Sequence, residues 1–202
     1  MKSAFLIPGL SLDHAFESST LDPLRESMLA QDIKLYGVTE SWRGHNLLSF
    51  GELAVEQAQL CQYDGMLIAH SLGALAALRV IDKIKPRYLV LCSPSALFSE
   101  DIKANNNPEL YQRIGERLMT ELKNFSAMDA VSEVNDRGVS TTILYGEKER
   151  DLYPDLVVRC QNLATDITDA ELIEVRGAAH FIGEEPYSSE LAQVASGIFT
   201  DL

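Results

Sequence analysis

Short runs of apolar residues recur along the chain, and each run ends at a glycine, a proline or a polar turn. Several of them are apolar at consecutive positions, which is typical of strands that are covered on both faces. The runs span residues 4–7, 33–36, 66–69, 88–91, 141–145 and 171–175. Between them, apolar residues recur at helical spacing near residues 15–30, 47–62, 72–84, 153–168 and 186–199. This alternation predicts an α/β fold with a mostly parallel sheet of about six strands and helices on both faces.

The connection between the fourth and fifth predicted strands, residues 96–140, is longer than the others. Its segment Asn105-Asn106-Asn107-Pro108 is typical of a turn followed by the start of a helix. Apolar residues then fall on one helical face, at Leu110, Ile114, Leu118, Leu122 and Phe125. We expect a short helical cap insertion here, and one long crossover helix with a loop is the alternative. Because no repeat or linker is visible, residues 1–202 are expected to form a single α/β domain.

The strongest chemical signal is the segment Ala69-His70-Ser71-Leu72-Gly73, which joins a predicted buried strand to an apolar helix of small residues. A serine with small residues two positions before and after it can occupy a strained strand-to-helix turn. Such a turn lifts the hydroxyl above the sheet and points the helix N-terminus at the group that the serine attacks. Ser71 is therefore the candidate nucleophile, and a packing serine is the alternative.

A nucleophilic serine needs a base, and the chain has four histidines. His180 follows the last predicted strand on a loop of small residues, which could carry its ring to the edge of the sheet where Ser71 lies. A surface histidine is the alternative. His70 is next to Ser71 and would point to the opposite side of the turn, so we expect it to be structural.

A carboxylate should orient the base, and it should follow the strand that precedes the histidine loop. Glu149 and Asp151 both qualify by position after the strand at 141–145, and Glu147 lies closer to the strand. The residues alone leave the choice open.

Taken in order, these motifs resemble those of α/β-hydrolases of the compact esterase and lipase-like kind, over almost the whole chain. The resembling segments are Leu6-Ile7-Pro8-Gly9-Leu10 for the first oxyanion loop, Ser41-Trp42-Arg43-Gly44-His45 for the next loop, 69–73 for the nucleophile elbow, 145–148 for the acid loop and 177–181 for the histidine loop. Ala69 stands where the family usually has glycine, and Pro8 replaces a histidine. The resemblance further implies about six parallel strands without the family's usual antiparallel first hairpin.

The acid loop departs from the family as well, with Glu149 where many relatives have aspartate three residues after the glycine. Asp151 lies five residues after that glycine, a spacing that resembles some small esterases of this fold. We prefer Asp151, because a shorter side chain would hold the imidazole more rigidly, and Glu149 is the alternative.

The resemblance implies that the chain cleaves a small carboxylic ester or thioester through an acyl-enzyme. Ser71 would attack and His180 would remove its proton. Backbone N–H groups of Leu10 and Leu72 would hold the oxyanion. Trp42 could contribute to substrate binding, or be an ordinary half-buried tryptophan. No metal or organic cofactor is needed for this chemistry.

Two other functions use the same residues. A C–C hydrolase or lyase of this fold, similar to menaquinone-pathway relatives, would use the triad mainly as a base. A ligand-binding member of the fold without catalysis is the third possibility.

The charge composition limits the classes of molecule that the chain is expected to bind. The chain has 30 acidic and 17 basic residues, and this net charge of −13 repels nucleic acid and anionic lipid. We therefore expect neither nucleic-acid nor membrane partners, and the oligomeric state stays open. The acidic surplus extends to the acid and histidine loops, which predicts a preference for neutral esters over anionic ones.

The cysteines and the N-terminal segment indicate the cellular compartment that the sequence predicts. Cys61, Cys92 and Cys160 are too far apart in sequence for a CxxC motif, which is typical of free thiols in a reducing compartment. The N-terminus lacks a small-residue cleavage site, and no apolar stretch approaches the ~18 residues of a membrane span. A cytoplasmic protein is expected.

Overall fold

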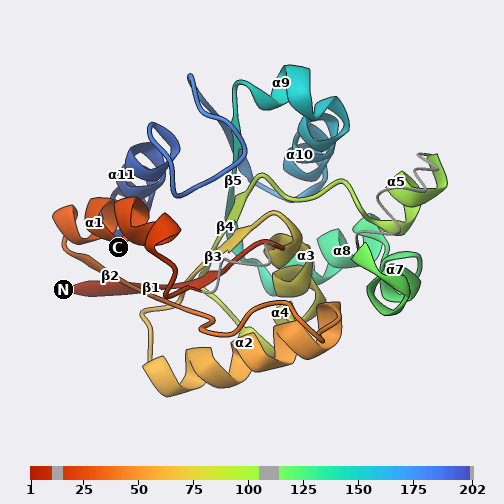
Figure 1. Ribbon diagram of the computed structural model, residues 1–202, viewed down its shortest axis with the longest axis horizontal. Coiled ribbons are helices and arrows are strands. Elements are labelled where there is room, and N and C mark those ends of the chain that lie inside the picture. Colours follow the sequence, from red (N-terminus) through yellow and green to blue (C-terminus); the bar gives the residue numbers. More distant parts are fainter. Residues whose placement is uncertain (11–15, 105–113, 201–202) are drawn as a thin grey trace.

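Six strands form one sheet in which every pair of neighbours is parallel, in the order β2-β1-β3-β4-β5-β6. The computed structural model describes residues 1–10, 16–104 and 114–200 (Figure 1). The strands are β1 (Lys2–Ile7), β2 (Ile33–Gly37), β3 (Met66–His70), β4 (Tyr88–Cys92), β5 (Ser140–Gly146) and β6 (Glu171–Val175). The predicted six-stranded parallel sheet is thus confirmed, and each strand contains one of the apolar runs.

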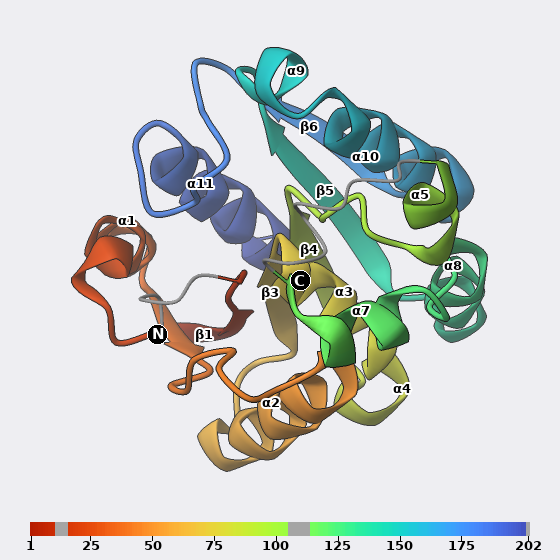
Figure 2. The same ribbon diagram turned by 45° about the vertical axis from the view of Figure 1, so that its right-hand side comes forward.

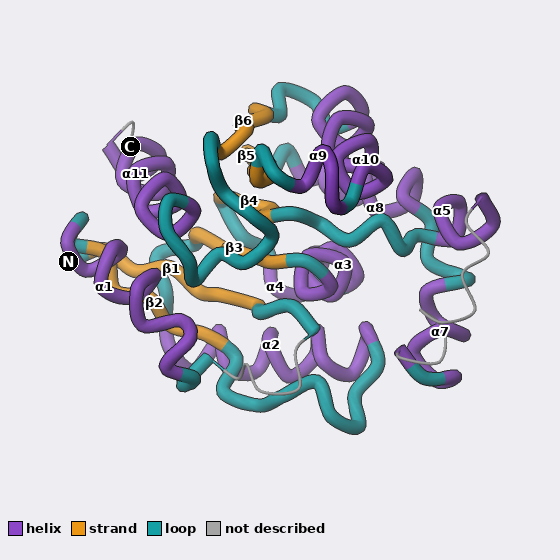
Figure 3. Tube along the Cα trace, turned by 45° about the horizontal axis from the view of Figure 1, so that its top comes forward, coloured by secondary structure: helices purple, strands orange, loops and turns teal. Residues whose placement is uncertain are grey.

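Helices cover both faces of this sheet (Figures 1 and 3). On one face lie α1 (Asp22–Ala30) and α11 (Tyr187–Thr200), and on the other lie α2 (Leu47–Cys61), α3 (Leu72–Arg79), α8 (Ala127–Arg137) and α10 (Pro154–Asp166). Strand β1 shows why its apolar residues are consecutive. Phe5 and Ile7 pack with the second helix layer, whereas Ala4 and Leu6 pack with the first.

Short helices fill the connections: η1 (Ser19–Leu21), α4 (Ile81–Ile84), α5 (Ser99–Ala104), α7 (Glu116–Leu122) and α9 (Glu149–Leu152). The predicted helix over 72–84 is divided, because α3 ends and α4 begins at Val80. Among the described residues, no helix has the length and apolar character that crossing a bilayer would require.

The long connection after β4 carries α5, α7 and α8 (Figure 2). Helix α8 packs on α3, α4 and α10, so it belongs to the helix layer, while α7 contacts α2. Leu118, Met119 and Phe125 are buried in the core on this face. The predicted turn at 105–108 and Leu110 lie outside the described residues.

The register of the sheet brings three strand ends together. Ile7 of β1 pairs with Ala69 of β3, and His70 of β3 pairs with Cys92 of β4. Since the strands are parallel, the loops that follow β1, β3 and β4 all leave from the same edge of the sheet. Side chains on these three loops therefore lie within reach of one another.

Candidate active site

Ser71 directly follows β3 at a tight turn into α3. Its backbone has φ 54° and ψ −120°, a combination that a serine adopts only under strain. The turn is closed by the Ser71 N–H, which donates to the carbonyl of Cys92 at 2.9 Å. A side chain at Gly73 would place its Cβ 2.4 Å from the Ile7 carbonyl oxygen, so only glycine lets α3 approach β1 this closely.

His180 reaches Ser71 from the loop after β6. Its Nε2 lies 3.1 Å from the Ser71 Oγ. The loop is fixed by its backbone, because the Lys148 N–H donates to the Ala178 carbonyl and the His180 carbonyl lies 2.9 Å from Nε2 of His70. The ring of His70 thus contacts this loop, and its centroid lies 4.9 Å from that of the His180 ring.

Glu149 is the carboxylate that contacts His180. Its Oε1 lies 2.5 Å from the His180 Nδ1, and its side chain is wholly buried. The other oxygen, Oε2, accepts hydrogen bonds from the Gly146 N–H at 2.6 Å and from the Ser93 hydroxyl at 2.7 Å. Ser93 Oγ also lies 3.1 Å from the hydroxyl of Tyr187. A buried carboxylate is tolerated when its oxygens are satisfied in this way.

The preferred acid, Asp151, is not the residue that the structure brings to His180. Asp151 is exposed to solvent on α9, two residues beyond Glu149. Glu149 begins α9, and its side chain turns back to the end of β5, where the Gly146 N–H holds it. The argument from side-chain length fails because hydrogen bonds and burial, rather than a short side chain, immobilise the glutamate.

The two expected oxyanion donors are backbone groups next to Ser71. Leu72 begins α3 directly after the serine. Leu10 follows Gly9, and a Cβ built on Gly9 would lie 2.9 Å from the Ser71 Cβ, so this loop passes beside the nucleophile. The side chain of Leu10 itself is 41% exposed.

Trp42 contacts the backbone of the loop after β1. Its indole N–H donates to the Pro8 carbonyl at 3.0 Å, and its ring stacks on Phe50 at a centroid distance of 3.9 Å. The side chain is buried. This placement ties Trp42 to the position of Pro8 and Gly9, and offers little of its surface to a substrate.

Two residues near the site escaped the sequence analysis, Ser93 and Ser95. Both lie on the loop after β4, and Ser95 Oγ lies 3.1 Å from the Ser71 Oγ. The segment Cys92-Ser93-Pro94-Ser95 contained a usable signal, since two hydroxyl side chains follow a strand that neighbours β3.

Burial also changes the ionisation of neighbouring groups. It raises the pKa of the Cys92 and Cys160 thiols well above their ordinary value, and the charge of Glu149 raises both further. Burial likewise raises the pKa of the Tyr187 hydroxyl. These groups are therefore neutral around Glu149. Within the described ranges, no group of three His, Cys, Asp or Glu side chains could hold a metal ion.

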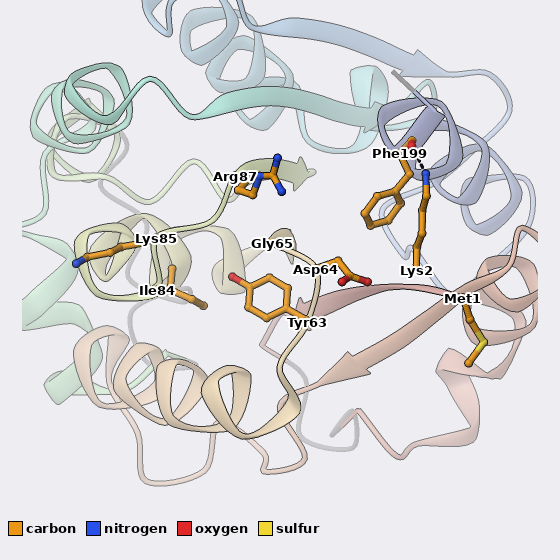
Figure 4. A pocket seen from close by; sticks show the side chains of 9 residues that line it. All are labelled: Met1, Lys2, Tyr63, Asp64, Gly65, Ile84, Lys85, Arg87 and Phe199. Atoms are coloured by element: carbon orange, nitrogen blue, oxygen red, sulfur yellow. Dashed lines mark hydrogen bonds between the residues drawn. The ribbon is translucent and has the colours of Figure 1, made fainter. Parts of the chain in front are cut away.

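A separate cavity of about 690 Å³ lies at the opposite edge of the sheet. Figure 4 shows Lys2, Tyr63, Arg87 and Phe199 around it, with the Lys2 ammonium directed at the Phe199 carbonyl. These residues precede or begin strands, or end α11, whereas Ser71 follows a strand. The cavity is therefore remote from the Ser71 hydroxyl.

The fold is similar to those of several solved hydrolase structures. Est1E from Butyrivibrio proteoclasticus matches with a TM-score of 0.73 and 14% identity, over 99% of this chain and 87% of that one. MGS-MChE2, an α/β-hydrolase enzyme from a sediment metagenome of the Mar Chica lagoon in Morocco, matches with a TM-score of 0.61 and 18% identity, over 99% and 91%. A monoacylglycerol lipase from Paleococcus ferrophilus matches with a TM-score of 0.64 and 18% identity, over 98% and 94%.

By contrast, no protein-family model and no curated protein matches the sequence of the chain. The fold can still be assigned, because it rests on the strand order, on the strained turn at Ser71 and on structural likenesses that extend over nearly the whole chain. The chain has the α/β-hydrolase fold.

Proposed function

We propose that this chain is a serine hydrolase that cleaves a small carboxylic ester or thioester through an acyl-enzyme. One observation carries the proposal. A continuous chain of contacts runs from the buried Glu149 carboxylate to Nδ1 of His180 at 2.5 Å, and from Nε2 of His180 to the Ser71 hydroxyl at 3.1 Å. A serine, a base and an orienting carboxylate in this relation are the parts that acyl transfer needs.

In acylation, Glu149, His180 and Ser71 act together on one proton. The Glu149 carboxylate accepts a hydrogen bond from the Nδ1–H of His180, which leaves the unprotonated Nε2 facing Ser71. As Oγ attacks the substrate carbonyl, its proton passes to Nε2, and Glu149 stabilises the imidazolium that forms. The same proton then goes to the departing alcohol or thiol, and the acyl group stays on Oγ.

The negative charge that develops on the carbonyl oxygen requires donors beside Ser71. The backbone N–H groups of Leu72 and Leu10 fit this role, because Leu72 begins a helix and Leu10 follows the loop packed against the serine. Each such donor typically lowers the barrier by ~3 kcal/mol. Water activated by His180 then attacks the acyl-enzyme, and Ser71 is restored.

The surroundings favour an uncharged substrate with an apolar part. Leu10 and Tyr153 are exposed beside the site, and the Tyr153 ring centroid lies 5.5 Å from that of His180. Among the described residues of the site, the charged side chain that is buried is the negative Glu149, and the protein carries a net charge of −13. Both features disfavour an anionic acyl group.

Hydrolysis of p-nitrophenyl esters and of acyl thioesters tests the proposal. We expect turnover by the wild type and its loss in Ser71→Ala, while Ser132→Ala, a change on the exposed side of α8, leaves the rate unchanged. Absence of turnover by the wild type across both substrate panels would contradict the proposed hydrolase. Equal rates for wild type and Ser71→Ala would contradict the role of the serine.

A further inference from the structure

We propose that Ser95 is a second catalytic hydroxyl, which donates a hydrogen bond to Oγ of Ser71 and stabilises that oxygen when it leaves the acyl-enzyme. The Oγ atoms of the two serines lie 3.1 Å apart, and both residues are half-buried. The inference rests on the proposed function, because it assigns a part of the same reaction to a residue outside the triad.

The direction of this hydrogen bond follows from counting protons. Nδ1 of His180 faces a carboxylate oxygen, so the ring proton is on Nδ1 and Nε2 can only accept. The single hydroxyl hydrogen of Ser71 therefore points to His180. In the contact between the serines, Ser71 Oγ has only lone pairs to offer, and Ser95 must be the donor.

The backbone fixes Ser95 relative to the nucleophile. The Ser95 N–H donates to the carbonyl of Ser71 at 3.3 Å, and the Ser93 N–H donates to the carbonyl of Leu144 at 2.7 Å. Pro94 joins the two serines and limits the freedom of the loop. Because the Ser93 hydroxyl also donates to Glu149, this one loop contacts both ends of the triad.

The hydrogen bond from Ser95 strengthens at one particular step. In deacylation, water attacks the acyl carbon and gives a proton to His180, and the tetrahedral intermediate then collapses. The bond from the acyl carbon to the Ser71 Oγ breaks, and Oγ takes the bonding electron pair while the imidazolium returns the proton. Since hydrogen bonds to an oxygen that gains negative charge are stronger than bonds to a neutral ester oxygen, Ser95 favours this departing Oγ over the ester Oγ of the acyl-enzyme.

Acylation gains less from the same contact. There the starting state is the free Ser71 hydroxyl, which already accepts the hydrogen bond from Ser95, so this bond changes less on the way to the transition state. Ser95 is therefore expected to act mainly on deacylation, and removal of its hydroxyl should cause the acyl-enzyme to accumulate.

Stopped-flow hydrolysis of p-nitrophenyl acetate separates the two steps, with the burst reporting acylation and the later linear phase reporting deacylation. For Ser95→Ala we expect the burst rate to stay close to that of wild type and the linear phase to slow by about tenfold or more. Intact-protein mass spectrometry should then find more acetylated enzyme at steady state. Ser95→Thr, which keeps a hydroxyl, should restore much of the linear rate, and Ser132→Ala should match the wild type.

Other results would overturn the inference. An unchanged linear phase in Ser95→Ala, or equal slowing of both phases, would show that the hydroxyl does not act on the departing oxygen. Failure of Ser95→Thr to improve on Ser95→Ala, with both variants melting at the wild-type temperature, would also contradict it. A wild-type enzyme with no burst and no turnover would count instead against the proposed function.

Discussion

Oε1 of Glu149 lies 2.5 Å from Nδ1 of His180, and the carboxylate that makes this contact is wholly buried. Burial of an unpaired charge would cost several kcal/mol, but the second oxygen of Glu149 accepts two further hydrogen bonds, from Gly146 and Ser93. The glutamate is thus held by the end of β5 and by the loop after β4, and it in turn orients the imidazole.

Replacement of this glutamate tests its assignment directly. Glu149→Gln keeps the size of the side chain but offers His180 an amide in place of a carboxylate, which no longer stabilises the imidazolium. We expect kcat on a p-nitrophenyl ester to fall by about 10³- to 10⁴-fold. The matched control is Asp151→Asn, which changes an exposed carboxylate two residues away and should leave kcat unaltered. A larger loss in Asp151→Asn than in Glu149→Gln would reverse the assignment.

Ser93 should act through Glu149 and not through the substrate. Ser93→Ala removes a donor from Oε2 and leaves the buried Tyr187 hydroxyl without this acceptor. We expect the free energy of unfolding in urea to fall by about 1–3 kcal/mol. On p-nitrophenyl esters kcat should drop at constant KM, because Ser93 is fully buried behind the triad. A rise in KM without a fall in kcat would instead place Ser93 in substrate binding.

The approach of α3 to β1 depends on Gly73. In Gly73→Ala the new Cβ would meet the carbonyl oxygens of Ile7 and Pro8 at 2.4 and 2.5 Å, so the loop after β1 must move away from Ser71. Loss of esterase activity together with a lower melting temperature is the expected result. Gly197→Ala in α11 is the control, since its Cβ has nothing within 4 Å and a helical alanine should stabilise the protein by about 0.5–1 kcal/mol. Full activity in Gly73→Ala would refute the close approach.

The buried thiols predict how stability depends on pH. Burial raises the pKa of Cys92 and Cys160 in the folded protein, so both stay protonated there, whereas in the unfolded chain they ionise above about pH 8.5. The unfolded state then binds fewer protons than the folded state, and the free energy of unfolding should decrease as pH rises from 8 to 10. Urea unfolding at several pH values measures this slope.

Reagent access to the same thiols gives an independent check. At pH 8 the half-buried Cys61 should react with a disulfide reagent, while Cys92 and Cys160 should react only after unfolding. Rapid reaction of all three thiols in the folded protein would contradict their burial.

The fold could be predicted from sequence because its signals are local. Each strand carries an apolar run, and Ala4 to Ile7 are consecutive because alternate side chains enter opposite layers. The break between α3 and α4 at Val80 was missed, since the apolar spacing continues across it. From the sequence pattern alone, residues 72–84 therefore look like one continuous helix.

The candidate site was only partly accessible to the same reasoning. Ser71 lies in a motif whose small neighbours are visible in the sequence, and His180 follows a strand on a loop of small residues. The choice between Glu149 and Asp151 depends on donors supplied by the loop after β4 and by the end of β5, which sequence spacing does not reveal. Ser95 was missed for the same reason, because its contact with Ser71 joins the loops that follow two neighbouring strands.

The central claim is that Ser71 is a nucleophile activated by His180, and active-site labelling tests it most directly. The protein is treated with a fluorophosphonate probe, and the labelled peptide is identified by mass spectrometry. We predict one label per chain on Ser71, no label in Ser71→Ala, and strongly slowed labelling in His180→Ala. Absence of labelling in folded wild-type protein, or labelling of a serine other than Ser71, would contradict the account.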